Sequence, residues 1–399
     1  MRILLSIIFI AFTGNSYCQE IQTKDKRTST ASKFVEDNNI DFLKQSDLGF
    51  NVIKINPSTN VKNQQQTGTC WSFSTTSLIE SQCLHNNIGN FDLSEMFTVR
   101  NIFVEKAKNY LLRQGHAQFS EGGLGHDVIR SISSYGAIPE SNYSGLPEKT
   151  SSYNHESLFK ELKTYVDSVL EISGKTAISN WMVGYNTILD KYLGAVPDSF
   201  TYNNNKYSPA SFSKEVMHFN AEDYINLTSF SHHPYYQPFV IEVPDNFSNG
   251  SYYNLHLNEM IQAVKIALLN GYTVLWDADI SNDGFNQEKG IALNISKEKI
   301  SSSNPINPDI IENPFYENIR QDLFENLKTQ DDHLMHIIGF EKSKDGKVFF
   351  IVKNSWGKNA GPYKGFIHVS EAYFGMNTIG LVLPKAALSK DLLKQLNIQ

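Results

Sequence analysis

Three short blocks, far apart in a chain of 399 residues, carry side chains that become useful only if the fold brings them together. The first reads NQQQTGTCWSF (63–73), the second HLMHIIGF (333–340) and the third VKNSWG (352–357). They supply a thiol at Cys70, two imidazoles, and a side-chain amide at Asn354. A cysteine attacks as its thiolate, so it needs a base and a group that orients the base, both from elsewhere in the fold. An early segment of the chain is therefore expected to face a late one, with the reacting groups between them.

The block around Cys70 predicts a helix that begins at the cysteine. No Gly or Pro occurs from Cys70 to about Leu84, Gly68 can supply the preceding turn, and Thr69 is a suitable N-cap residue. The positive end of the helix dipole then favours a thiolate. Cys83 follows thirteen positions later, several helical turns away, where it could not bridge to Cys70. It is expected to be a small buried apolar residue.

Composition and charge exclude some classes of partner. Apolar residues make up 40% of the chain and aromatic residues 12%, as in packed globular proteins. The net charge of −7 comes without any basic run, which argues against a nucleic-acid partner. His232 and His233 are adjacent, and in a strand they would point to opposite faces. Neither a metal nor an organic cofactor is expected.

The N-terminus has the pattern of an export signal. Arg2 precedes an apolar run over residues 3–12, which is too short to span a bilayer. Cleavage is expected near Cys18, so residues 1–18 are interpreted as a signal peptide and residues 19–50 as a leader. Lipid attachment at Cys18 is disfavoured by the bulky Tyr17 before it. The mature protein is then expected to be exported, periplasmic or secreted, without membrane association.

Helical patterns come first and strand patterns last, which predicts an α+β fold, organised in two lobes. Helices are expected over residues 70–84, 93–113, 128–135 and 257–269, with two more between 154 and 195. Residues 196–258 combine polar loops with short strands. Strands are expected over residues 239–243, 272–276, 334–340, 348–353 and 365–369.

The three blocks, in this order, resemble those of the papain-type cysteine peptidases. Gln64, Gly68 and the pair CW (70–71) match the first block of that family. His333 begins a predicted strand and has Gly339 six positions on, as the family's catalytic histidine often does, whereas His336 does not. On an alternating strand the two histidines would face opposite sides, so only one can reach the cleft.

The distance between the blocks indicates one branch of the family. His333 follows Cys70 by 263 positions, whereas roughly 130–150 positions separate the two in ordinary papain-like enzymes. This gap, with EGG (121–123), YGAIPES (135–141) and YKGF (363–366), resembles the bleomycin hydrolase and aminopeptidase C branch. The likeness covers most of residues 45–395. A peptidase domain over residues 51–399, with an insertion at about 150–260, is expected.

The resemblance implies a papain-like two-lobed fold, with a helical left lobe, a β-barrel-like right lobe and an active-site cleft between them. It implies that Cys70 is the nucleophile, His333 the base and acid, and Asn354 the group that orients the imidazole. Gln64, favoured over its neighbours Gln65 and Gln66, would donate to the oxyanion beside the Cys70 amide. The expected substrate-binding residues are Gly122, Gly123 and Trp356, and His336 is expected to be an interior or lining residue.

The expected activity is hydrolysis of peptides at or near their N-terminus. The family often forms hexameric rings, so a homo-oligomer is consistent with the resemblance. Typical members end in an arm that reaches the cleft, whereas only a short helical tail over residues 388–399 is expected here. Two alternatives therefore stay open: an endopeptidase or dipeptidyl-type peptidase with an open cleft, and a non-catalytic peptide-binding protein on the same scaffold.

Overall fold

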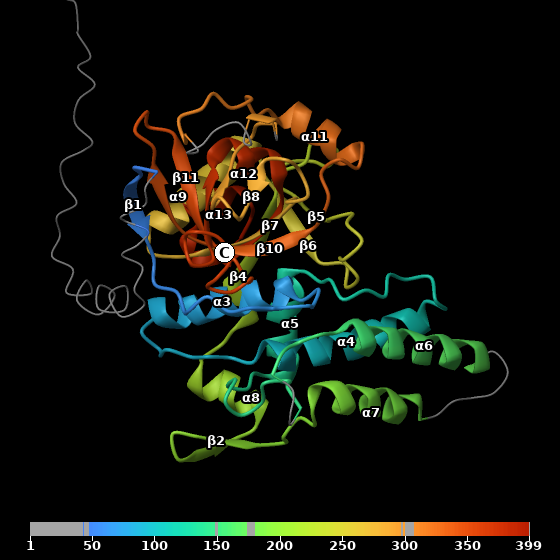
Figure 1. Ribbon diagram of the computed structural model, residues 1–399. Helices are drawn as coiled ribbons and strands as arrows, with labels where there is room; N and C mark the ends of the chain where they lie inside the picture. Colours follow the sequence, from blue (N-terminus) through green and yellow to red (C-terminus); the bar gives the residue numbers. More distant parts are fainter. Residues whose placement is uncertain are drawn as a thin grey trace, which may run out of the picture.

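The computed structural model describes residues 43, 48–147, 151–173, 180–296, 298–299 and 307–398, so the expected signal peptide and most of the leader lie outside it. The described chain forms two lobes, one mostly helical and one built on a sheet (Figure 1). Helix α3 (Cys70–His85) lies on the side of the helical lobe that faces the sheet. The expected α+β class with two lobes is confirmed.

The helical lobe follows the predicted helices closely. It contains α3, α4 (Glu95–Leu112), α5 (Gly125–Tyr135), α6 (Glu156–Ser173), α7 (Trp181–Leu193), the short α8 (Pro209–Ser211) with its π-helical continuation Phe212–Val216, and the hairpin of β2 (Phe200–Tyr202) and β3 (Asn205–Tyr207). Helix α4 begins after Ser94, whose hydroxyl accepts from the Phe97 amide at 3.1 Å. Helix α5 begins three residues earlier than predicted, because the Asp127 carboxylate accepts from the Leu124 amide at 3.3 Å.

The second lobe is built on a sheet of eleven strands. Its order is β5 (Pro238–Val240), β6 (Ser251–Asn254), β4 (Tyr224–Thr228), β13 (Thr378–Pro384), β7 (Val274–Ala278), β10 (His333–Lys342), β11 (Val348–Lys353), β12 (Phe366–Ser370), β9 (Ile291–Ala292) and β8 (Phe285–Asn286), while β1 (Asn51–Ile55) pairs with β10. Strand β10 lies between β7 and β11, antiparallel to both. The strand that begins with His333 is therefore fixed on both sides.

Several predicted strands have different bounds, and two of these differences have clear local reasons. The strand predicted over residues 239–243 ends at Val240, because the Ile241 carbonyl accepts from the side chain of Asn246 at 2.9 Å. Strand β7 begins two residues later than predicted, because the Tyr272 amide still bonds the Ala267 carbonyl at the end of the preceding helix.

The sheet separates two hydrophobic cores. On one face, Leu275 and Leu334 pack into the core shared with the helical lobe. On the other face, Trp276 and Met335 pack against α9 (Leu257–Leu269) and α12 (Glu371–Asn377). Helix α11 (Glu317–Glu325) lies at the top of the sheet lobe (Figure 1). Among the described residues, no helix combines the length and the apolar character needed to cross a bilayer.

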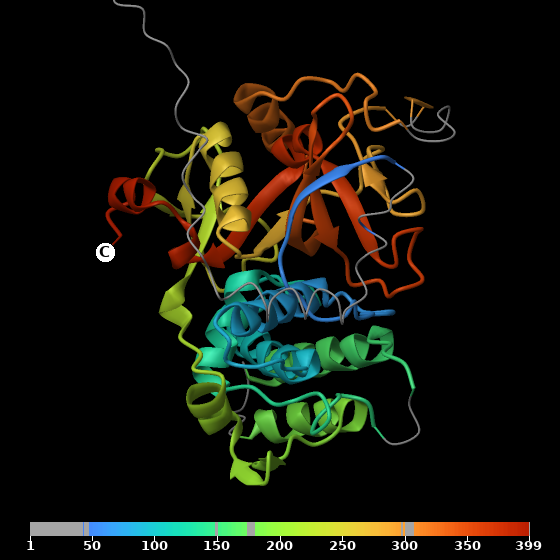
Figure 2. The same cartoon turned by 90° about the vertical axis from the view of Figure 1, so that its left-hand side faces the viewer.

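The C-terminal tail ends on the face of the sheet away from α3. A 3₁₀ turn, Lys385–Ala387, leads into α13 (Lys390–Gln395), and Leu392 and Leu393 pack against the core that α9 covers. Figure 2 shows α13 beside α9 at the outer edge of the sheet lobe. The described part of the tail therefore does not enter the junction between the lobes.

Candidate active site

Cys70 is the first residue of α3 and is nearly buried. Thr69 stands at the N-cap position, but the expectation that its side chain caps the helix was wrong, because its hydroxyl hydrogen-bonds the Thr67 hydroxyl at 2.5 Å instead. The amide of Cys70 lies in the first turn, where helical N–H groups have no partner within the helix. This amide and the helix dipole both favour negative charge at the sulfur or beside it.

The start of β10 lies directly against the Cys70 thiol. The backbone of Leu334 lies close enough to the Cys70 thiol to lower its pKa and so to favour the thiolate. One turn along α3, the Ser74 hydroxyl donates to the carbonyl of the same Leu334 at 2.6 Å. His333 immediately precedes this residue, so the structure docks the helix that begins with the predicted thiol on the strand that begins with the predicted base, across 263 positions of sequence.

The His333 ring is held by the third block. Its Nε2 lies 2.7 Å from Oδ1 of Asn354, and its ring centroid lies 4.9 Å from that of Trp356. Because an amide oxygen can only accept, the hydrogen of a neutral ring lies on Nε2 and the lone pair on Nδ1. The ring is therefore prepared to take a proton at Nδ1 while Asn354 fixes its orientation.

His336 points the other way, as the alternation of the strand predicts. Its Nδ1 lies 2.8 Å from the hydroxyl of Ser77 on α3, and its side chain is fully buried. Burial holds the pKa of His336 well below its usual value. It is a neutral interior residue that joins β10 to α3.

Gln64 is fixed beside the third block. Its backbone amide donates to the Ser355 carbonyl at 2.8 Å, and its Oε1 accepts from the Ser355 hydroxyl at 2.6 Å. Its Nε2 donates to the Thr67 carbonyl at 2.8 Å, which uses one of the two amide hydrogens. The side chains of Gln65 and Gln66 bind a different segment of the chain. Gln65 accepts from the Tyr153 amide, and Gln66 accepts from the Asn154 side chain.

Gly122 and Gly123, the two glycines predicted to bind substrate, are called the shelf, and each lies against a larger group. A Cβ at Gly123 would lie 3.0 Å from the Trp71 ring, and a Cβ at Gly122 would lie 1.7 Å from a carboxylate oxygen of Asp245. Asp245 belongs to the loop between β5 and β6, within the expected insertion, and its Oδ1 accepts from the Ser120 hydroxyl at 2.9 Å. A loop of the insertion therefore lies directly over the shelf.

Loss of water disfavours the charged forms of both reacting groups. Burial, with smaller contributions from the charges of Asp331 and Asp277, raises the pKa of the Cys70 thiol to about 12. Burial lowers the pKa of the His333 imidazole to about 4, although the Asn354 hydrogen bond opposes this. A thiolate–imidazolium pair therefore depends on the attraction between its members, the Leu334 backbone and the start of α3.

One residue at the site was missed by sequence analysis. Gln287, which follows β8, accepts through Oε1 from Nδ2 of Asn354 at 2.9 Å. Its own Nε2 donates to the carbonyls of Ala360 and Phe366 at 3.2 and 3.3 Å. It thereby helps to fix which way the Asn354 amide faces. A lone glutamine in a loop carries no motif, so only the fold reveals it.

The two adjacent histidines outside this site were described wrongly from the sequence. His232 and His233 lie in a turn, and their Nε2 atoms contact the Glu242 carboxylate at 3.2 and 2.7 Å. They converge because a turn, unlike a strand, does not alternate its side chains. Among the described residues, this is the one trio of His, Cys, Asp or Glu whose ligand atoms lie within 4.8 Å of one another.

Comparison with known proteins agrees with this geometry. A model of the Peptidase C1-like family matches residues 195–399, and a model of the papain family cysteine proteases matches residues 51–209. The first match covers half of the chain and includes His333 and Asn354, while the second includes Cys70. The chain belongs to the Peptidase C1-like family. It is thus a cysteine-type peptidase.

Similar proteins cover most of this Peptidase C1-like chain. Aminopeptidase G of Lactobacillus delbrueckii subsp. lactis is 23% identical over 84% of this chain and 83% of its own length. Aminopeptidase C of Listeria monocytogenes is 24% identical over 84% of this chain and 82% of its own length. The crystal structure of PepW from Lactobacillus rhamnosis superposes with a TM-score of 0.68 at 21% identity, covering 92% of this chain and 90% of that one.

Proposed function

We propose that this peptidase is an aminopeptidase whose nucleophile is Cys70, with His333 as base and acid and Asn354 as the orienting group. The observation that carries the proposal is the docking of α3 on the start of β10 through the Ser74–Leu334 hydrogen bond, because it brings the helix that begins with Cys70 against the strand that begins with His333, which Asn354 already holds.

The reaction follows from the placement of these groups. His333 accepts the thiol proton at Nδ1, and the sulfur of Cys70 attacks the peptide carbonyl. The carbonyl oxygen becomes an oxyanion, which the Cys70 amide and the remaining Nε2 hydrogen of Gln64 stabilise. The imidazolium then protonates the leaving amine, and a thioester to Cys70 remains. Water, deprotonated by His333, hydrolyses the thioester and restores the thiol.

Two observations support cleavage near the N-terminus. Relatives that align with most of this chain carry the names aminopeptidase G, C and W. In addition, the carboxylate of Asp245 lies over Gly122, so a long peptide cannot extend along the shelf in that direction. An open cleft would instead favour cleavage within long chains.

Matched cysteine variants test the nucleophile. We expect Cys70→Ala to lower peptide hydrolysis at least about 10³-fold, with an unchanged circular dichroism spectrum. Cys83→Ala removes the other described cysteine, which is also buried and free, and is expected to stay active. Activity retained by Cys70→Ala would exclude the proposed nucleophile. If N-acetylated peptides are cut as fast as free ones, an endopeptidase with an open cleft replaces the aminopeptidase.

Export is a separate part of the proposal. It rests on Arg2 and the apolar run over residues 3–12, which have the composition of a cleaved signal. N-terminal sequencing of the protein from fractionated cells should find a chain that begins after Cys18, outside the cytoplasm. An intact N-terminus in the cytoplasmic fraction would contradict it.

A further inference from the structure

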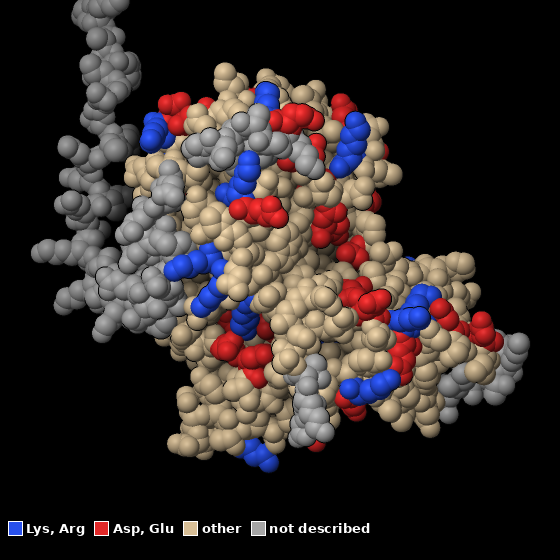
Figure 3. Space-filling model, viewed as in Figure 1, with Lys and Arg blue, Asp and Glu red and all other residues tan. Residues whose placement is uncertain are grey.

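Three aspartates from separate elements approach one another beside the Cys70 thiol. Asp245 lies in the loop between β5 and β6, Asp277 lies in β7, and Asp331 lies two residues before β10. The charges of Asp277 and Asp331 both act on Cys70, and Asp245 acts on each of them. Acidic side chains are visible on both sides of the junction between the lobes (Figure 3).

Strand pairing fixes where Asp277 points. It lies opposite Leu334 in the β7–β10 ladder and opposite Gly380 in the β7–β13 ladder. Cross-strand partners share a face of the sheet, so Asp277 lies on the face of Leu334, toward the helical lobe. Gly380 has no side chain to shield it, and the Tyr252 ring fills the space above this glycine.

Asp277 has no hydrogen-bond donor among the described residues. Its side chain is 3% exposed, and neither carboxylate oxygen is partnered; Oδ2 of Asp331 is also buried and unpartnered. The Asp277 and Asp331 carboxyls act on each other, and the charges of Asp245 and Asp332 act on both. Nearby acidic groups are satisfied, since Asp279 accepts from the Gln330 amide and Asp332 from two backbone amides. A buried polar group left without a partner is costly and indicates a missing ligand.

Lys106 is the basic residue whose charge acts on this trio, but it does not neutralise all three aspartates. Lys106 is buried and acts on Asp245 and Asp331, but its ammonium donates to the carbonyls of Ser120 and Gly122. Because burial and the neighbouring aspartates raise the pKa of Asp277 and of Asp331, these carboxyls release their protons most readily when a cation binds beside them. The site therefore favours a cation.

The spacing of the three carboxylates indicates which kind of cation they can bind. Within the described part of the chain, ligand atoms converge within 4.8 Å only at His232, His233 and Glu242, so the three aspartates are too far apart to share one metal ion. An ammonium or guanidinium group, with several N–H donors, can bridge carboxylates that are more widely spaced.

We propose that Asp245, Asp277 and Asp331 bind a positively charged nitrogen group of the peptide substrate next to the bond that Cys70 attacks. The inference rests on the proposed peptidase function and adds a substrate class. The group is either the α-ammonium of the peptide or a basic side chain near its N-terminus. Asp245 and Asp331 are partly exposed, so the cation can enter past them to reach Asp277.

Binding of the cation would also activate the thiol. The charges of Asp277 and Asp331 oppose ionisation of Cys70. A bound cation neutralises them, which favours the thiolate when a suitable substrate is in place. The cationic group is therefore expected to raise kcat as well as to lower KM.

Four pentapeptides distinguish the sources of the charge. They begin with Leu or Lys, each with the α-amine free or acetylated, and cleavage is followed by mass spectrometry. The acetyl-Leu peptide lacks a cation at this end and should have a kcat/KM roughly 10- to 100-fold lower than the best of the others. If only the two free peptides are preferred, the α-ammonium is the ligand; if both Lys peptides are preferred, it is the basic side chain.

The variants are Asp277→Asn and Asp331→Asn, with Asp322→Asn on the exposed surface of α11 as the control. Each of the first two should reduce the advantage of cationic peptides to within about threefold, while cleavage of the acetyl-Leu peptide stays the same or becomes faster, because loss of a carboxylate also favours the thiolate. A preference that survives in both variants, or its absence in the wild type, overturns the inference. If the wild type cuts no peptide in a Cys70-dependent manner, the proposed function itself has failed.

Discussion

Asn354 holds His333 through its oxygen and is itself held through its nitrogen. An amide can rotate by half a turn and exchange these atoms, which would present a donor to the imidazole and lose the hydrogen bond. Gln287 and the Ser355 amide oppose this, because Oε1 of Gln287 can only accept from Nδ2 of Asn354 and the Ser355 N–H can only donate to Oδ1. The orientation of the base thus depends in part on Gln287, which lies behind Asn354.

Gln287→Ala is expected to lower kcat roughly tenfold with little change in KM, since the imidazole loses orientation rather than substrate contacts. Steady-state kinetics on a peptide amide measure this split. Gln262→Ala, on the exposed side of α9, is the control and should leave both constants unchanged. An equal loss of kcat in both variants, or a change in KM alone, would contradict the positioning role.

Motifs predict some of these residues and not others. Cys70, His333 and Asn354 lie in blocks whose order and spacing are specific; the structure joins His333 to Asn354 and docks the helix that begins with Cys70 on the strand that begins with His333. Gln287 and Asp277 carry no local pattern, because their roles arise from strand pairing and from loops that meet after folding.

At the scale of elements, α3 and β10 are joined by a row of hydroxyl contacts. Ser74 donates to the Leu334 carbonyl and Ser77 contacts His336, so residues on one side of the helix bind alternate positions of the strand. Nearly all of α3 is buried, which explains why it tolerates short polar residues that are mediocre helix formers. The sequence predicted this helix almost to its last residue, but not which serines would find partners.

Ser77→Ala should lower the free energy of unfolding by about 1–3 kcal/mol, because it leaves Nδ1 of the buried His336 without a partner. Urea denaturation measures the change. Ser81→Ala is the matched control on the same helix, since the Ser81 hydroxyl is buried and has no partner within the described chain. We expect it to change stability by less than about 0.5 kcal/mol. Equal destabilisation by both changes would show that burial, not the contact with His336, decides the effect.

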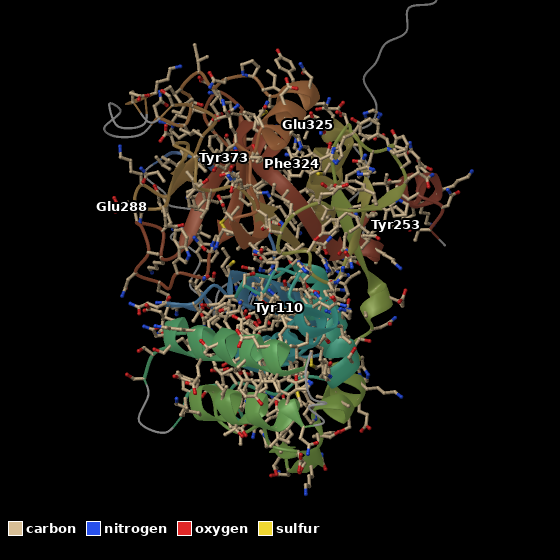
Figure 4. The ribbon with its side chains drawn as sticks, turned by 90° about the vertical axis from the view of Figure 1, so that its right-hand side faces the viewer. Tyr110, Tyr253, Glu288, Phe324, Glu325 and Tyr373 are labelled. Carbon is tan, nitrogen blue, oxygen red and sulfur yellow. The ribbon has the colours of Figure 1, made fainter. Side chains whose placement is uncertain are left out.

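The whole molecule places its reacting groups where the helical lobe and the sheet lobe meet over a shared core. Figure 4 shows Tyr110 of α4 on the helical side of this junction and Phe324, Glu325 and Tyr373 within the sheet lobe. Composition and the order of elements predicted the two lobes, because helical periodicity and β-prone runs occupy different parts of the chain. They did not predict the loop that places Asp245 over Gly122, since no local signal says where a polar loop will dock.

The acidic groups at this junction make stability depend on pH. Burial, together with the charge of Asp245, raises the pKa of Asp331 to about 7; Asp277, Asp332 and Lys106 also face it. The folded state then keeps a proton that the unfolded chain releases near pH 4, so this contribution to stability is present below about pH 4 and is lost as pH rises through 7.

Asp331→Asn removes this dependence. Urea denaturation at pH 4.5, 6 and 8 should show the stability of the variant, relative to the wild type, increasing with pH. A difference that is constant or decreases with pH would show that the Asp331 carboxyl is not held protonated by the fold.

The central claim is that His333 activates Cys70 across the junction. The rate of alkylation by iodoacetamide, read for each cysteine by peptide mass spectrometry, tests it most directly, with Cys83 as the internal reference. In the native protein Cys70 should react quickly and Cys83 hardly at all, and His333→Ala should slow Cys70 at least about tenfold. If Cys70 reacts no faster than Cys83, or just as fast without the imidazole, the account is wrong.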